Sequence, residues 1–126
     1  MFQLQTAVTP LDKIQQLVNT ISDDIEFVLL GECTHGTHEF YNIRAEMTKS
    51  LVKERNYRII LLESDWHNIW KINQYINYKS TDKTAIESLS DIKKFPLWMW
   101  RNHVMINLIE WLRTFNKRSE ERRVGK

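Results

Sequence analysis

The stretch "VLLGECTHGTHEF", residues 28–40, marks the point where a buried strand is predicted to end and a helix to begin. Just before and into it, "FVLLG", residues 27–31, is a short apolar run typical of a strand. Thr37 is the predicted N-cap of a helix over about 38–55, because a threonine side chain accepts a hydrogen bond from the first helical turn. The sequence therefore predicts a strand, a short loop and a helix in immediate succession.

A second apolar run, "YRIILLE" at residues 57–63, follows this helix and predicts a second strand. Both strands are apolar on both faces, as in a parallel sheet that is covered on each side. Strand, helix and strand then form a right-handed βαβ unit. The predicted fold class is α/β, with a largely parallel sheet flanked by helices. Further helices are predicted from Thr9–Asp12, from Asp65 with Trp66, Ile69, Trp70 and Ile76 on its apolar side, and from about Asn102.

Titratable side chains gather where the two predicted strands end. Glu32 follows the first strand and Glu63 ends the second, so the two carboxylates are expected at one edge of the sheet together with His35. Arg44, two turns into the helix, is long enough to reach back as their cation. A neutral imidazole can take a proton from water, and Glu32 could orient the ring of His35. These residue types predict a hydrolytic site.

Four blocks of sequence follow one another along the chain: "LGECTHGTHEF" with Arg44, "LESDW" at 62–66, "FPLWMWRN" at 95–102 and "WLRTFN" at 111–116. Together they resemble the N-terminal part of the erythromycin esterase family. The resemblance covers about Val28 to Asn116 and implies an α/β fold with a sheet flanked by helices. It also implies hydrolysis of a macrolide lactone or a related small-molecule ester by an attacking water, with no covalent enzyme intermediate. No cofactor is expected.

The resemblance also assigns roles to residues. His35 matches the general base of the family, Glu32 and Glu63 match acidic residues of its cleft, and Arg44 matches its arginine. Family members are longer and place another catalytic histidine downstream, so this chain is expected to be a fragment that is inactive alone. Cys33 stands where alanine is common in the family, and a small thiol fits the same space.

Other candidate residues and functions stay open at this stage. His38 is either a substrate-binding residue or a polar residue at the helix start, and Cys33 as a nucleophile is a weaker alternative to water. A divalent metal held by Glu32, His35 and Glu63, as in the TraB-type proteases, is a second function, although no third nitrogen ligand is evident. Haem binding, as in the ChaN-like fold, is a third. The aromatic block supplies either core packing or the lining of a substrate cleft, through Trp98, Trp100 and Arg101.

Composition limits the partners of the chain. It has 18 Lys and Arg against 16 Asp and Glu, and residues 118–126 hold four of the bases and two of the acids. The remaining 14 bases and 14 acids balance, so no basic field for nucleic acid is expected. The sequence has no apolar run of about 18 residues and no signal peptide, so no membrane association is expected. A single cysteine suits the cytoplasm.

The last nine residues, "RSEERRVGK" at 118–126, resemble the translation of a sequencing adapter. We therefore expect residues 1–117 to be the N-terminal part of an esterase-like catalytic domain and residues 118–126 to be a non-native tail. The alternative is an ordinary charged helix terminus. The sequence does not predict an oligomeric state.

Overall fold

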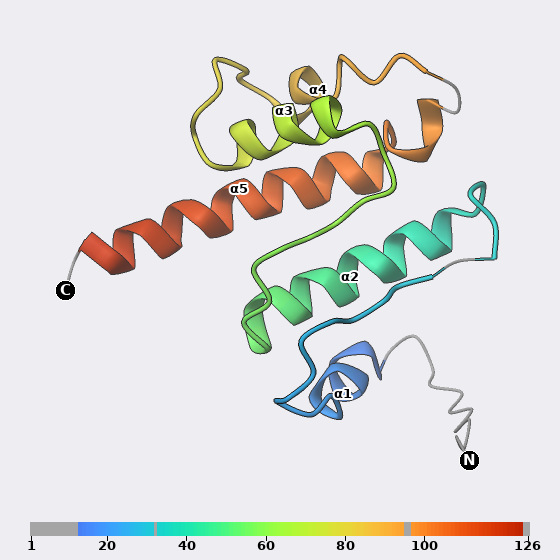
Figure 1. The fold of residues 1–126 in the computed structure, drawn as a ribbon, viewed down its shortest axis with the longest axis vertical. Coiled ribbons are helices and arrows are strands. Elements are labelled where there is room, and N and C mark those ends of the chain that lie inside the picture. Colours follow the sequence, from blue (N-terminus) through green and yellow to red (C-terminus); the bar gives the residue numbers. More distant parts are fainter. Residues whose placement is uncertain (1–12, 32, 95–96, 125–126) are drawn as a thin grey trace. The chain divides into compact units, whose positions relative to one another are not determined.

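The computed structural model describes residues 13–31, 33–94 and 97–124, and every regular element among them is helical (Figure 1). The chain divides into two compact units, Met1–Arg58 and Ile59–Lys126. None of the helices in the described part is long and apolar enough to cross a membrane. The helices are α1 (Ile14–Asn19), α2 (His38–Glu54), α3 (Trp66–Ile76), α4 (Ala85–Ser88), the 3-10 helix η2 (Leu97–Met99) and α5 (His103–Val124).

The predicted α/β fold is wrong for the described residues, because neither predicted strand pairs with another segment. Residues 27–31 and 57–63 are extended but belong to no sheet. Every second apolar side chain of these segments is therefore left exposed, with Leu29 at 92 % and Leu61 at 83 % of full exposure, while those between them are half-buried. Two strands alone rarely make a stable sheet, and strands that are apolar on both faces need cover on both sides. The boundary between the two units also falls inside the second segment.

In the first unit α1 packs against α2, with Val18 fully buried. The chain that leaves α1 is tied to the end of α2 by side chains. Arg55 donates to the carbonyl of Ile21 and forms an ion pair of 2.6 Å with Asp23, and the Tyr57 hydroxyl donates to the carbonyl of Ile25 at 2.5 Å. The predicted helix start at 9–12 lies outside the described residues.

Helix α2 confirms the predicted helix over 38–55 to within one residue at its end. Asn56 follows with a φ of 61°, a left-handed conformation that asparagine tolerates, and this residue ends the helix. The predicted apolar face is only partly buried, because Phe40, Ile43 and Met47 are half-buried. The fully buried side chains of α2 are Tyr41, Ala45, Leu51 and Val52.

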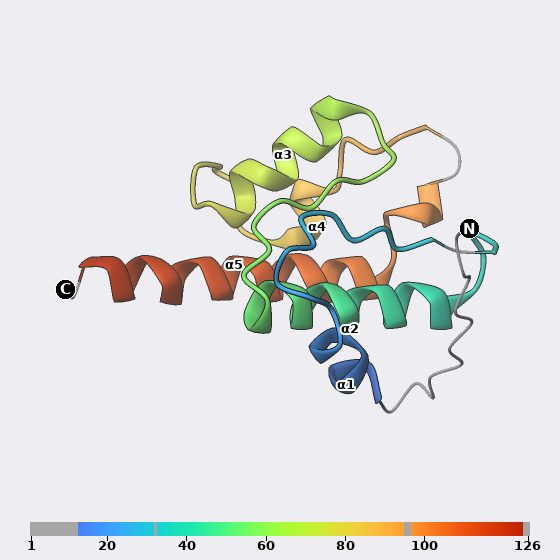
Figure 2. The ribbon, with the colours of Figure 1, turned by 60° about the horizontal axis from the view of Figure 1, so that its bottom comes forward.

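In the second unit α3 and α4 pack against α5, an arrangement visible from two directions (Figures 1 and 2). Helix α5 begins where predicted, because the Asn102 side chain caps it by accepting from the Met105 amide at 3.0 Å. Its buried residues repeat with helical spacing and form one apolar stripe. They are Val104, Met105, Leu108, Ile109 and Leu112.

Helix α3 has the predicted bounds but buries a different side. Ile72 and Tyr75 are buried, whereas Trp66 is 66 % exposed and Trp70 is 54 % exposed. The polar end of Tyr75 explains how so large a side chain is accommodated, because its hydroxyl contacts both Glu110 carboxylate oxygens of α5 at 2.9 and 3.0 Å. A buried tyrosine with a partner for its hydroxyl packs as well as an apolar ring.

Tyr78 ends α3 in a strained conformation that α5 offsets. Its φ of 59° is unusual for a bulky residue. The Lys79 amide donates to the Gln74 carbonyl at 2.9 Å and closes the helix end. The Tyr78 hydroxyl donates to the carbonyl of Arg113 in α5 at 3.1 Å. The Arg113 guanidinium carbon lies 3.9 Å from the centre of the Tyr78 ring. This cation–π contact fixes the loop after α3 on α5.

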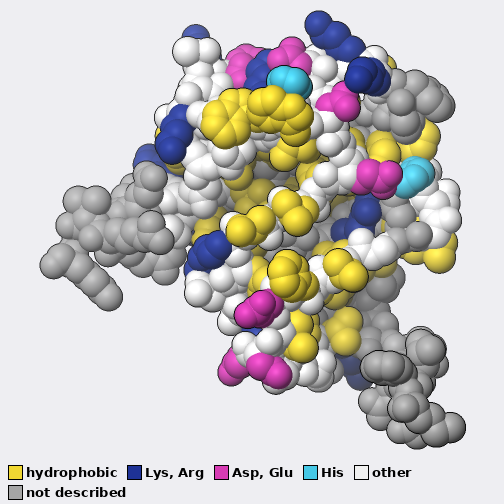
Figure 3. Space-filling model, in the orientation of Figure 1, with side chains coloured by type: hydrophobic (Ala, Val, Ile, Leu, Met, Phe, Trp, Pro, Cys, Tyr) yellow, Lys and Arg dark blue, Asp and Glu magenta, His cyan; other side chains and the backbone are white. Residues whose placement is uncertain are grey.

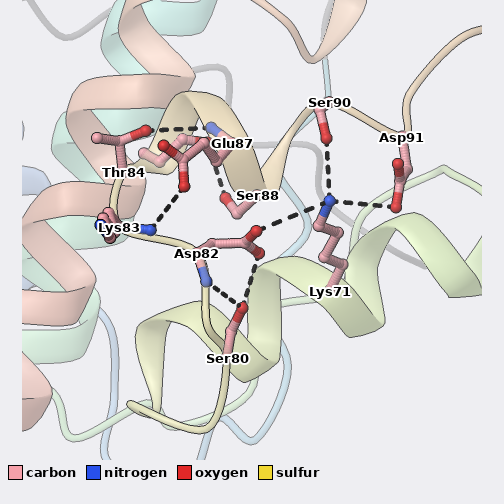
Figure 4. Close-up of polar contacts among 10 residues, drawn as sticks. Lys71, Ser80, Asp82, Lys83, Thr84, Glu87, Ser88, Ser90 and Asp91 are labelled. Atoms are coloured by element: carbon pink, nitrogen blue, oxygen red, sulfur yellow. Dashed lines mark hydrogen bonds and ion pairs between the residues drawn. The ribbon is translucent and has the colours of Figure 1, made fainter.

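Lys71 of α3 holds the segment around α4 in place (Figure 4). Its ammonium group donates to the Ser90 hydroxyl at 2.9 Å and lies 3.2 Å from an oxygen of Asp91 and 3.9 Å from one of Asp82. Helix α4 has its own cap, since the Thr84 hydroxyl accepts from the Glu87 amide at 3.2 Å. These contacts give the second unit a polar network beside its apolar core.

Candidate functional site

The loop that carries His35 is fixed to the first turns of α2. The Tyr41 hydroxyl donates to the carbonyl oxygen of His35 at 2.6 Å, across six residues of sequence. Inside the loop the Gly36 amide donates to the Thr34 hydroxyl at 3.3 Å. The His35 side chain itself is exposed. The main chain of the predicted general base is thus anchored while its ring stays accessible to a ligand.

Arg44 lies on the same helix, one turn after Tyr41. Its guanidinium carbon is 4.9 Å from the centre of the Tyr41 ring, which is a cation–π contact. The guanidinium is half-buried. Since Tyr41 contacts His35 with its hydroxyl and Arg44 with its ring, these three residues form one cluster in the first unit.

The other predicted residues of this loop are exposed or lie outside the described part. Glu32 lies outside the described part, so its predicted role in orienting His35 stays a prediction. Cys33 carries a free, exposed thiol. His38 begins α2 and is exposed. Thr37 occupies the N-cap position, but its side chain makes no cap hydrogen bond, so the amides of the first turn of α2 are not capped by it.

Glu63 belongs to the second unit, and it too has an anchored main chain. The Trp100 indole N–H donates to the Glu63 carbonyl oxygen at 3.0 Å. The Glu63 side chain is exposed, although the apolar run before it predicted a buried carboxylate. The Trp100 ring is 7 % exposed, so its visible contribution is to packing and to this hydrogen bond.

Two further predicted residues sit beside Trp100. Trp98 is 45 % exposed and is the more accessible of the two tryptophans. Arg101 is exposed and donates to the Ile92 carbonyl at 3.4 Å. Substrate binding by Trp98, Trp100 and Arg101 stays a prediction.

A charged pair lies just after Glu63 in the sequence, at the start of α3. The Lys94 ammonium lies 2.8 Å from an Asp65 carboxylate oxygen. The hydrogen bond and charge of Lys94 hold the pKa of Asp65 below its usual range, and Asp65 raises the pKa of Lys94 in turn. Both side chains are exposed, so this is a solvent-screened surface pair that contributes little stability, and not a buried site. The sequence predicted Asp65 only as the start of this helix, and its side chain makes no cap hydrogen bond.

The structure describes one local cluster of candidate residues in each unit. His35 and Arg44 meet around Tyr41 in the first unit, and Glu63 meets Trp100 in the second. The sheet edge that was expected to join the two carboxylates does not form among the described residues. Neither Tyr41 nor the hydrogen bond from Trp100 was singled out from the sequence. The signal for Tyr41 is an aromatic residue six positions after the histidine and three before the arginine.

The predicted metal alternative has no ligand set in the described part of the chain. No group of three His, Cys, Asp or Glu side chains there is arranged to hold a metal ion. Glu32, one of the three ligands considered, lies outside this part.

Comparison with known families shows to which family the chain belongs. The sequence profile of the family described as erythromycin esterase matches residues 52–125, more than half of the 126 residues. The chain belongs to the erythromycin esterase family. Membership relates it to hydrolases of the esterase type. No solved structure matches the chain.

The match to the erythromycin esterase family covers some of the candidate residues and not others. It includes Glu63 and the block with Trp98, Trp100 and Arg101. It does not include the loop with His35 or the first turns of α2 with Arg44. The match also runs through most of residues 118–126, and the division of the chain at residue 117 stays a prediction.

Proposed function

We propose that the full-length protein, the product of the uninterrupted gene, hydrolyses a carboxylic ester of the macrolide-lactone type with water activated by His35. The 126-residue chain alone is inactive in this proposal, because the resemblance of its motifs implies a further catalytic histidine downstream. The proposal rests on an exposed His35 whose loop is held by a hydrogen bond from Tyr41. Arg44 contacts the ring of the same tyrosine. The chain that carries these residues belongs to the erythromycin esterase family. The proposal places the enzyme in the cytoplasm, where it would confer resistance to macrolide antibiotics.

The chemistry assigned to the first cluster is general-base catalysis. A neutral His35 imidazole takes a proton from water as the water oxygen bonds to the acyl carbon of the ester. The tetrahedral intermediate then expels the alcohol oxygen, which receives the proton back from the imidazolium. Products are a carboxylic acid and an alcohol, which remain one molecule when the ester closes a ring.

The developing negative charge needs stabilisation at the same time. Arg44 supplies a fixed positive charge one turn from Tyr41. The first-turn amides of α2 supply further donors, since Thr37 does not cap them. Preorganised donors of this kind commonly contribute about 10²–10³ in turnover. In this proposal Glu32 orients the imidazole, and Glu63 keeps the acidic role that the resemblance assigns to it.

The test is hydrolysis of a 14-membered macrolide by purified full-length protein, followed by mass spectrometry for the addition of one water. A panel of simpler esters is assayed in parallel, because the sequence does not specify the substrate. The 126-residue chain serves as the matched control and is expected to show no turnover. Failure of the full-length protein on every ester would contradict the proposal, and turnover by the short chain would contradict the need for a downstream histidine.

A further inference from the structure

Tyr41 is a buried side chain of the first unit that the proposed chemistry does not use. It lies in the second turn of α2 with 6 % of its surface exposed. Its hydroxyl donates to the main-chain carbonyl of His35 at 2.6 Å. A buried tyrosine hydroxyl that loses its partner is costly, so this bond persists as long as the ring stays buried.

The same ring also contacts Arg44. The guanidinium carbon of Arg44 is 4.9 Å from the ring centre, within the range of a cation–π interaction. Arg44 follows Tyr41 by three positions, so the two side chains share one face of the helix. One buried side chain therefore touches both the loop of the proposed base and the cation that would stabilise the transition state.

The direction of the His35 ring depends on the backbone from which it projects. A hydrogen bond to the His35 carbonyl fixes the peptide plane that follows this residue. The bond spans a loop that contains Gly36, a residue with a wide range of accessible backbone conformations. Without an external anchor, such a loop samples many orientations of its histidine.

We propose that Tyr41 is a positioning residue that fixes His35 and Arg44 relative to each other. This inference rests on the proposed function for its kinetic consequence, but not for its structural one. Removing the hydroxyl removes its hydrogen bond to the His35 carbonyl, while the ring remains in contact with Arg44. Small displacements of a catalytic group lower turnover much more than substrate binding.

The test variant is Tyr41→Phe in the full-length protein, and Tyr57→Phe is the matched control. Tyr57 makes the same type of bond in the same unit, from its hydroxyl to the Ile25 carbonyl at 2.5 Å. We expect Tyr41→Phe to lower kcat by about 10- to 100-fold with little change in KM. Tyr57→Phe should leave kcat within about twofold, because a hydrogen bond away from the reacting groups supports only stability.

Hydrogen exchange measured by mass spectrometry separates this inference from the proposed function. In Tyr41→Phe the peptide covering residues 33–40 should exchange about fivefold faster, as expected for one lost hydrogen bond. In Tyr57→Phe the change should appear around residue 25 instead. Faster exchange at 33–40 in a protein that hydrolyses no ester would support the anchor and reject the esterase. Equal losses of stability in both variants, with wild-type exchange at 33–40 and wild-type kcat, would overturn the inference.

Discussion

His35 combines an exposed side chain with an anchored main chain. That combination suits a general base, which must reach solvent and substrate while keeping its direction. Glu63 repeats it in the second unit, where the Trp100 indole N–H holds its carbonyl oxygen at 3.0 Å. In both cases the polar group of a buried aromatic residue fixes the backbone of an acid or base. At the scale of single residues, Tyr41 and Trp100 each hold the main chain of a candidate residue by one hydrogen bond.

Replacement of His35 by alanine in the full-length protein tests the proposed base. We expect turnover to fall by about 10² to 10⁴, the usual contribution of a general base. The fold should survive, because the side chain is exposed. His38→Ala should change turnover far less, since this exposed residue begins α2. The measurement is the rate of ester cleavage under saturating substrate, with circular dichroism to check the fold.

The free thiol next to this loop provides a second comparison. Cys33→Ala should be nearly silent, because water is the nucleophile in the proposed mechanism. If Cys33→Ala abolished turnover while His35→Ala retained it, a thiol mechanism would have to replace water activation.

At the scale of elements, helices were far more predictable than strands. Helices α2, α3 and α5 begin where predicted, because signals for a helix start are local in sequence, although the Thr37 and Asp65 side chains make no cap hydrogen bond. The extended segments 27–31 and 57–63 were predicted as paired strands, but pairing depends on partners distant in sequence. An apolar run indicates only that a segment prefers burial, and it does not supply the neighbouring strand.

The buried faces of the helices were less predictable than their bounds. On α3, Trp66 and Trp70 have the larger apolar surface, yet α5 covers the side with Ile72 and Tyr75. The reason is a hydrogen-bond network. Glu110 of α5 accepts a hydrogen bond from the Tyr75 hydroxyl and another, at 2.7 Å, from the Ala85 amide at the start of α4. Hydrophobicity alone could not identify a face that is chosen by a hydrogen-bond network.

This network gives the second unit a defined response to alkaline pH. Burial, and then the Glu110 carboxylate, raise the pKa of Tyr75 from 10.0 to about 12. Below pH 10 both the folded and the unfolded chain keep the phenol proton, so the stabilisation is complete. Between pH 10 and 12 only the folded chain keeps it, so the free energy of unfolding should fall as pH rises. Denaturant titrations from pH 8 to 11.5 should reveal this loss.

Two variants separate Tyr75 from other groups that titrate at high pH. Tyr75→Phe should be less stable at pH 8 by about 1–3 kcal/mol, because Glu110 loses a partner, and it should lack this part of the alkaline slope. Glu110→Gln removes the charge but not the burial, so its slope should be reduced and not abolished. An unchanged slope in Tyr75→Phe would assign the alkaline loss to another residue.

At the scale of the whole molecule, removal of residues 118–126 tests whether they are a tail. We expect the free energy of unfolding to change by no more than about 0.5 kcal/mol, as for other surface changes. The matched control is removal of residues 116–126. It also deletes the Asn116 side chain, which donates to the Ile76 carbonyl at 3.0 Å, and should cost about 0.5–1.5 kcal/mol more. A loss beyond about 2 kcal/mol in the shorter deletion would make these residues part of the fold.

Large apolar side chains stand at the surface of both units, and this sets the solution behaviour of the chain (Figure 3). Ile59 is 79 % exposed and Phe27 is 77 % exposed, on segments that form no sheet with another segment of the described residues. Unpaired extended segments of this kind promote association between molecules. We therefore expect the isolated 126-residue chain to bind hydrophobic dyes and to be poorly soluble.

Leu61→Ser tests both the dye binding and the helical architecture in one experiment. Leu61 is 83 % exposed, so the substitution should reduce dye fluorescence while changing the free energy of unfolding by no more than about 0.5 kcal/mol. Leu108→Ser is the matched control, because Leu108 is 6 % exposed in the apolar stripe of α5 and should lose about 2–5 kcal/mol, as for other truncations of buried leucine. If Leu61→Ser were as costly as Leu108→Ser, Leu61 would have to be buried in solution, and its exposed position in the structure would be refuted.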